Sequence, residues 1–100
     1  MKLFIDTSAV DTAKVAIEVD GKRYEKLSQS RVMKSQMVLP MIEEILREHK
    51  LRLTDITAIT VVTGPGSFTG LRVGATVANA LGYLLHVPVN GKKALAIPTY

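Results

Sequence analysis

The chain has 100 residues, 47% of them hydrophobic, and a formal net charge of +4. This length suits one small domain with a thin core, and the apolar content is too high for a disordered chain. No apolar run reaches membrane-spanning length, and an acid at position 6 interrupts the first apolar stretch too early for a signal peptide. With no cysteine, disulfides and thiolate metal sites are excluded, and we expect a cytoplasmic protein.

The first third of the chain predicts three antiparallel strands. Residues 2–6 form a short apolar run, and residues 13–19 alternate between apolar and polar side chains. Asp20 and Gly21 follow, and this pair favours a two-residue hairpin because both central positions of a type I′ turn need positive φ. Residues 22–28 are therefore expected to form the returning strand.

The remaining elements alternate between helix and strand. Residues 30–50 show helical spacing, although Pro40 should kink this helix or mark its first turn. Residues 56–62 are rich in β-branched side chains and predict a fourth strand. A long helix over residues 69–86 precedes a short fifth strand at 87–90. The expected fold is thus α/β, a five-stranded mixed sheet with helices packed on it.

Asp6, Thr7 and Ser8 stand where the first strand ends. One carboxylate and two hydroxyls at such a position could hold a magnesium ion or approach a phosphate. The same three residue types also hydrogen-bond to nearby backbone and start turns. The turn is the preferred interpretation, and the phosphate site is the alternative.

Residues 64–74, Gly-Pro-Gly-Ser-Phe-Thr-Gly-Leu-Arg-Val-Gly, lead from the fourth strand into the long helix. Free backbone donors at a helix N-terminus favour an anion, so Gly64, Gly66 and Ser67 are candidate phosphate ligands. The segment lacks the Gly-Lys-Ser/Thr of a P-loop and the spacing of a dinucleotide fingerprint. The alternative is a tight strand-to-helix connection with Ser67 or Thr69 as the N-cap.

Two helical stripes predict a contact surface for a partner or a second copy. Small residues recur every four positions along the long helix, and each interior glycine costs roughly 1 kcal/mol relative to alanine, so a closely approaching neighbour should compensate. Methionines, which adapt to irregular surfaces, recur every four positions along the first helix. The residues of this surface are Met33, Met37, Met41, Ile45, Gly70, Gly74, Ala78 and Gly82. A broad core face is the alternative for the methionines.

The charged residues and histidines point to binding rather than catalysis. Cations between Lys22 and Lys34, and Lys92 with Lys93, could attract nucleic acid or an acidic partner, or could simply be solvated. Aromatic residues do not alternate with these cations, so autonomous binding of single strands is not expected. No metal site or Ser-His-Asp set can be assembled from the two histidines, and we expect no catalytic residues.

Residues 5–8, 39–42 and 64–74 strongly resemble the N-terminal half of the TsaB (YeaZ) family. That family is the bacterial scaffold subunit of the machinery that makes threonylcarbamoyladenosine beside the anticodon of tRNA. The resemblance implies a ribonuclease-H-like domain of the actin/Hsp70-like ATPase superfamily. It also implies a non-catalytic subunit, similar to its catalytic partner TsaD but lacking the metal-binding histidine motif.

The resemblance further implies partners. Family members assemble TsaD with the ATPase TsaE and form homodimers through the helices of the first domain, which here carry the methionine and small-residue stripes. They usually run to about twice this length, so residues 1–100 are expected to be one domain, equivalent to the first half, with the second domain absent. Any ATP and magnesium would then bind at the partner, and tRNA contact would be indirect.

Two alternative functions stay open from the sequence. The first is an ATP-binding, ATPase-like enzyme that uses Asp6 and the glycine-rich segment. The second is direct tRNA binding through the cations between Lys22 and Lys34.

Overall fold

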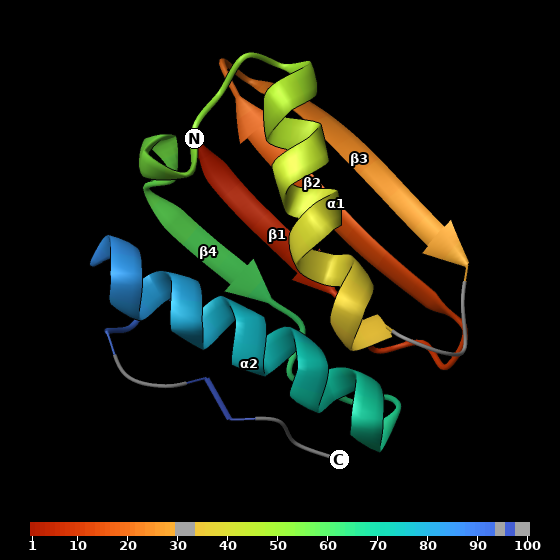
Figure 1. The fold of residues 1–100 in the computed structure, drawn as a ribbon. Helices are drawn as coiled ribbons and strands as arrows, with labels where there is room; N and C mark the ends of the chain where they lie inside the picture. Colours follow the sequence, from red (N-terminus) through yellow and green to blue (C-terminus); the bar gives the residue numbers. More distant parts are fainter. Residues whose placement is uncertain (30–33, 94–95, 98–100) are drawn as a thin grey trace.

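The computed structural model describes residues 1–29, 34–93 and 96–97 and shows strands and helices in the predicted order through the second helix (Figure 1). The elements are β1 (Lys2–Asp6), β2 (Thr12–Val19), β3 (Lys22–Gln29), α1 (Lys34–Glu48), the 3₁₀ turn η1 (Leu53–Asp55), β4 (Ala58–Val61) and α2 (Phe68–Leu85). Met33, one of the predicted contact residues, lies outside the described residues.

The four strands form one mixed sheet in the order β3-β2-β1-β4. β2 is antiparallel to both β1 and β3, and β1 is parallel to β4. Asp20 and Gly21 turn the chain between β2 and β3 with φ angles of 54° and 76°, and Val19 pairs with Lys22 across the turn. The predicted hairpin is therefore confirmed, since these left-handed angles are the ones that a type I′ turn requires.

Both helices pack on the same face of the sheet (Figure 1). α1 contacts β2 and β3, α2 contacts β4 and β1, and the two helices contact each other. Alternate side chains of each strand point to one face, and on this face Leu3, Ile5 and Ile59 join a single buried apolar cluster with residues of both helices. The C-terminal end of β1 consequently lies beneath the first turns of α2, where the phosphate-site residues were predicted.

The predicted fifth strand at 87–90 is wrong, and over residues 1–29, 34–93 and 96–97 the sheet has four strands. Only Val89 pairs there, through single bridges to Ile59 and Lys92. Asn90 and Gly91 have φ angles of 53° and 76°, so the chain turns back at once. The ribonuclease-H-like classification stays a prediction.

Asn90 completes the edge of β4 with its side chain instead. Its backbone N–H donates to the carbonyl of Ile59 at 2.8 Å. Its Oδ1 accepts from the Val61 N–H at 2.8 Å, and its Nδ2 donates to the Val61 carbonyl at 3.0 Å. A side-chain amide thus pairs with backbone groups that a longer fifth strand would have satisfied, which removes unpaired groups from this edge.

Pro40 lies inside α1, so the prediction that it marks the first turn is wrong. Proline has no N–H to donate to the carbonyl four residues earlier, which is a cost in any helix interior. Pro40 is exposed, whereas its near neighbours Val38 and Ile42 are fully buried against the sheet. Burial of the apolar face of α1 therefore stabilises the helix across Pro40, although proline disfavours a helix interior.

Candidate functional site

Asp6 and Ser8 form a turn at the end of β1. The Asp6 Oδ1 accepts a hydrogen bond from the Ser8 N–H at 3.0 Å and another from the Ser8 Oγ at 2.6 Å. An aspartate that binds the backbone two residues further on is an Asx-turn. The preferred turn interpretation of this segment is therefore confirmed.

The turn at the end of β1 is tied to the glycine-rich segment. The Ser67 N–H donates to the Ser8 carbonyl at 2.7 Å, and the buried Thr7 hydroxyl donates to the Gly70 carbonyl at 2.5 Å. A side chain on Gly66 would not fit here, because its Cβ would lie 2.6 Å from the Ser8 carbonyl oxygen. We call residues 6–8 together with 66–70 the strand–loop clasp.

Ser67 is the N-cap of α2, as one of the two sequence alternatives predicts. Its Oγ accepts from the Gly70 N–H at 3.2 Å, so one of the backbone donors at the start of the helix is already used within the chain. Gly64, with φ 149°, occupies a conformation that side-chain-bearing residues rarely adopt. The contacts of the clasp therefore favour a structural role, and phosphate binding stays a prediction that they do not support.

The small-residue stripe of α2 faces the interior of this chain. Gly70, Gly74, Ala78 and Gly82 are all buried. A Cβ on Gly74 would press into the Thr7 hydroxyl, and one on Gly82 would lie 2.5 Å from the Val89 Cγ2. The predicted close approach thus exists, but within this chain, where α2 lies against Thr7 at the end of β1 and against Val89 after the helix. These four residues leave little surface for a partner, and their placement on a contact surface is corrected.

The methionine stripe of α1 is also mostly internal. Met41 and Ile45 belong to the apolar core. Met37 is half-buried and lies beside the Ser28 hydroxyl, which donates to its sulfur at 3.8 Å. The broad-core alternative therefore describes Met41 and Ile45, and Met37 is half-buried whereas Met41 is buried.

A partly apolar groove lies on the other side of α2, and Phe68 is its exposed aromatic residue. A groove of about 340 Å³ runs along the N-terminal half of this helix, and we call it the α2 groove. Phe68 is 54% exposed at one end, and the Arg72 guanidinium lies over its ring, 5.3 Å from the ring centroid. The groove is lined by Phe68, Thr69, Arg72, Val73, Thr76 and Val77. The groove was not predicted from the sequence. The apolar side chains on the helix face opposite the glycines were the feature that could have indicated it.

The cations between Lys22 and Lys34 are partly neutralised by neighbours. The Lys26 Nζ lies 2.9 Å from the Glu44 Oε1 and 3.1 Å from the Glu48 Oε2, which ties β3 to α1. The Arg23 Nε donates to the Glu25 carboxylate at 2.9 Å. This pairing leaves less free positive charge in the segment than the sequence suggested for tRNA binding.

The ion pairs of Lys26 with Glu44 and Glu48 should make a small contribution to stability that is lost at acid pH. The hydrogen bond from Lys26 holds the pKa of Glu44 below its usual value of 4.5. A lowered folded-state pKa adds stability above pH 4.5 that is lost as pH falls through the lower value. Replacing Lys26 with methionine should slightly reduce the loss of unfolding free energy on acidification. The difference between the variant and the unaltered chain should be smaller in 1 M salt, because the charged groups are exposed and salt screens them. Urea unfolding at a series of pH values measures this, and an unchanged pH profile would show that the pairs contribute nothing.

Within residues 1–29, 34–93 and 96–97, no three His, Asp or Glu side chains gather closely enough to hold a metal ion. Over the same residues, no helix combines the length and apolar character needed to cross a membrane.

Comparisons with known proteins agree on one relationship. A family model described as "TsaD: tRNA N6-adenosine threonylcarbamoyltransferase" matches residues 30–96. The chain is 48% identical over 54 residues to the tRNA N6-adenosine threonylcarbamoyltransferase of Nitrosospira multiformis. The aligned segment covers 54% of this chain and 16% of that protein. It is 37% identical over 93 residues to the tRNA threonylcarbamoyladenosine biosynthesis protein TsaB of Escherichia coli, covering 93% of this chain and 40% of the relative.

The solved structures point the same way. The structure of YeaZ from Pseudomonas aeruginosa matches with a TM-score of 0.84 and 32% identity, over 88% of this chain and 41% of that chain. The fold and these matches define a protein of the group related to the threonylcarbamoyltransferases. Within that group, the chain belongs to the TsaB/YeaZ family. It spans less than half the length of these TsaB and YeaZ relatives.

Proposed function

We propose that this chain is a non-catalytic scaffold domain in tRNA threonylcarbamoyladenosine biosynthesis. Its role is to bind and assemble a TsaD-like catalytic partner in the cytoplasm. Support comes from its membership of the TsaB/YeaZ family, whose Escherichia coli member is named as a protein of this biosynthesis. The match to the TsaD family model adds that the partner would be a protein of related fold.

The α2 groove is the observation that carries the proposal. It combines an exposed aromatic ring, two valines and one arginine on a helix whose opposite face is buried. Aromatic residues and arginine are enriched in protein interfaces, and apolar surface gathered on one face marks contact sites. The groove is open rather than enclosed by this chain, so a helix of another protein can lie along it.

A related partner makes a specific geometry reasonable. If the TsaD-like protein presents its own equivalent helix, the two helices pair about an approximate two-fold axis. The same surface would allow a symmetric homodimer when the partner is absent. A TsaE-like ATPase would join the assembled pair, and tRNA would reach this chain within that complex.

The ATP-binding alternative receives less support. Asp6, its central carboxylate, already accepts two hydrogen bonds from Ser8. The Ser67 N–H and the Thr7 hydroxyl are engaged in the strand–loop clasp as well. In the proposed role, ATP and magnesium act at the partner, and this chain needs no cofactor of its own.

Replacing Thr76 with arginine should weaken the complex with a TsaD-like protein about tenfold or more, which is about 1.4 kcal/mol. Thr76 is exposed in the α2 groove, so the longer, charged side chain would obstruct a docked helix without disturbing the core. Titration calorimetry with the TsaD-like protein of the same organism measures the affinity, and light scattering measures the mass of the complex.

Thr60→Arg is the matched control. Thr60 is also exposed, but it lies on β4 between the buried residues Ile59 and Val61 and so points to the opposite face of the sheet. This control should bind as the unaltered chain does. Equal affinities for both variants would remove the α2 groove from the interface.

A further inference from the structure

We propose that a cavity at the C-terminal end of α2 binds one nucleotide of single-stranded RNA, its base against Tyr83 and its phosphate at Lys93. The cavity measures about 400 Å³, within the range of small-ligand sites, and we call it the Tyr83–Lys93 cavity. The idea rests on the proposed function, in which the modified substrate is a tRNA. It goes further, because there the RNA contact is only indirect.

Charge is the first reason to expect a phosphate. All nine aspartates and glutamates of the chain stand at or before Asp55. Residues 56–100 therefore carry only cations, namely Arg72, Lys92 and Lys93, and no carboxylate lines the cavity. Such asymmetry between the two parts of a chain is typical of proteins that meet a polyanion. In contrast to Lys26 and Arg23, neither Lys92 nor Lys93 has a carboxylate among the residues that line this cavity with it.

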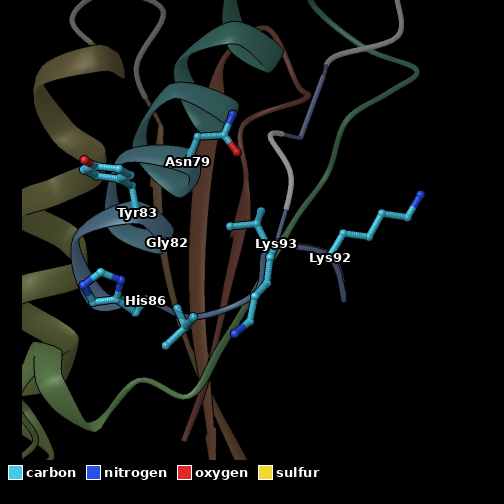
Figure 2. A pocket seen from close by; sticks show the side chains of 8 residues that line it. Asn79, Gly82, Tyr83, His86, Lys92 and Lys93 are labelled. Atoms are coloured by element: carbon cyan, nitrogen blue, oxygen red, sulfur yellow. The ribbon is translucent and has the colours of Figure 1, made fainter.

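An exposed aromatic ring is the second reason. Tyr83 is 80% exposed, and Figure 2 shows its ring with the His86 ring along one side of the cavity. Lys93 runs past the cavity from the other segment, while Lys92 extends away from the tyrosine (Figure 2). Every base offers a π-face, so a free aromatic ring near a cation is the minimal unit of single-strand recognition. This pair was not predicted from the sequence, because Tyr83 and Lys93 come from different segments.

Local hydrogen bonds fix the walls of the cavity. The Asn79 side chain donates to the Ala96 carbonyl and accepts from the Ala96 N–H, each at 2.9 Å. The Val87 N–H donates to the Gly82 carbonyl at 3.1 Å, which closes the end of α2. Val89 and Lys92 exchange two backbone hydrogen bonds of 2.8 and 3.1 Å just before Lys93. The segments that carry the ring and the cation are thus ordered before any ligand arrives, which lowers the entropic cost of binding.

Fluorescence anisotropy of the chain with a labelled hexa-adenylate RNA tests the proposal. Tyr83→Ala should weaken binding about 5-fold or more, the low end of what one stacked base contributes, and Tyr83→Phe should retain it. Lys93→Ala should weaken binding several-fold and make the slope of log K against log salt shallower by about 0.7. Both side chains are exposed, so these variants keep the fold.

Lys2→Ala is the matched control, since it removes the same charge from an exposed position on β1, outside both the cavity and the segment between Lys22 and Lys34. It should change the affinity less than twofold. Equal losses for Lys2→Ala and Lys93→Ala would mean unspecific attraction and would overturn the proposal, as would failure of the unaltered chain to bind RNA at low salt. If Tyr83→Ala weakens binding of the TsaD-like protein but not of RNA, the cavity is a protein contact, and the proposal is equally wrong.

The two proposals fail separately. Thr76 does not line the Tyr83–Lys93 cavity. A normal complex with the TsaD-like protein and no RNA binding rejects only the nucleotide site. RNA binding that depends on Tyr83 and Lys93, in a chain that forms no complex, rejects only the scaffold role.

Discussion

Replacing Ala78 with arginine is expected to lower the free energy of unfolding by on the order of 3–5 kcal/mol, enough to unfold most small domains. Ala78 is 0% exposed and belongs to the apolar core between α2 and the sheet. A guanidinium placed there would have no partner and no room. Urea unfolding followed by circular dichroism measures the change, or shows that the variant has no cooperative transition.

Ala80→Arg supplies the control on the same helix. Ala80 is exposed, so the identical substitution should change the free energy of unfolding by no more than about 0.5 kcal/mol. The pair decides between two interpretations of the small-residue stripe. A folded, stable Ala78→Arg variant would show that the small-residue stripe lies on the molecular surface, as was predicted from helical spacing.

Replacing Asn90 with alanine is the second change with a large expected effect, about 3–4 kcal/mol of lost stability. It leaves the N–H and carbonyl of Val61 without their side-chain partners, each worth about 1 kcal/mol or more. It also places alanine at φ 53°, which costs a further 1–2 kcal/mol. Urea unfolding measures the total, and hydrogen exchange of the Val61 amide measures the local effect.

Asn90→Gly separates the two causes. Glycine accepts the left-handed angle without strain but cannot bind Val61, so it should lose only the hydrogen-bond part. The Val61 amide should exchange faster in both variants. Protection of that amide at its original level in Asn90→Ala would show that another group satisfies it and that Asn90 does not complete the sheet edge.

Local chemistry was readable from the sequence. The turn at Asp20 and Gly21, the Asx-turn of Asp6 and the N-cap at Ser67 were each predicted and are each present. In all three, the groups that interact lie within a few residues of one another, so the side chains themselves specify the geometry. The resemblance of residues 5–8, 39–42 and 64–74 to the TsaB (YeaZ) family also agrees with the matches to known proteins.

The extent of the sheet could not be read in the same way. The β-prone residues near 87–90 suggested a fifth strand, but the left-handed turn at Asn90 and Gly91 ends the pairing after Val89. The fold then uses the Asn90 amide in place of backbone. One side chain that pairs with a strand edge produces no repeating pattern in the sequence, so this pairing could not be predicted from hydrophobic periodicity.

The sequence by itself determined the order of the strands and helices through the second helix, the tight turns and the helix cap, and its resemblance to known proteins indicated the family. Only the tertiary structure decided which face of each helix is inside. The spacing of Gly74 and Gly82 requires a close neighbour, but Thr7 and Val89 turn out to be those neighbours. Likewise Tyr83 and Lys93 line one cavity only because the chain reverses at Asn90. The spacing of residues along a helix predicts that one helix face is buried. Which residues bury that face depends on long-range packing, which the spacing does not contain.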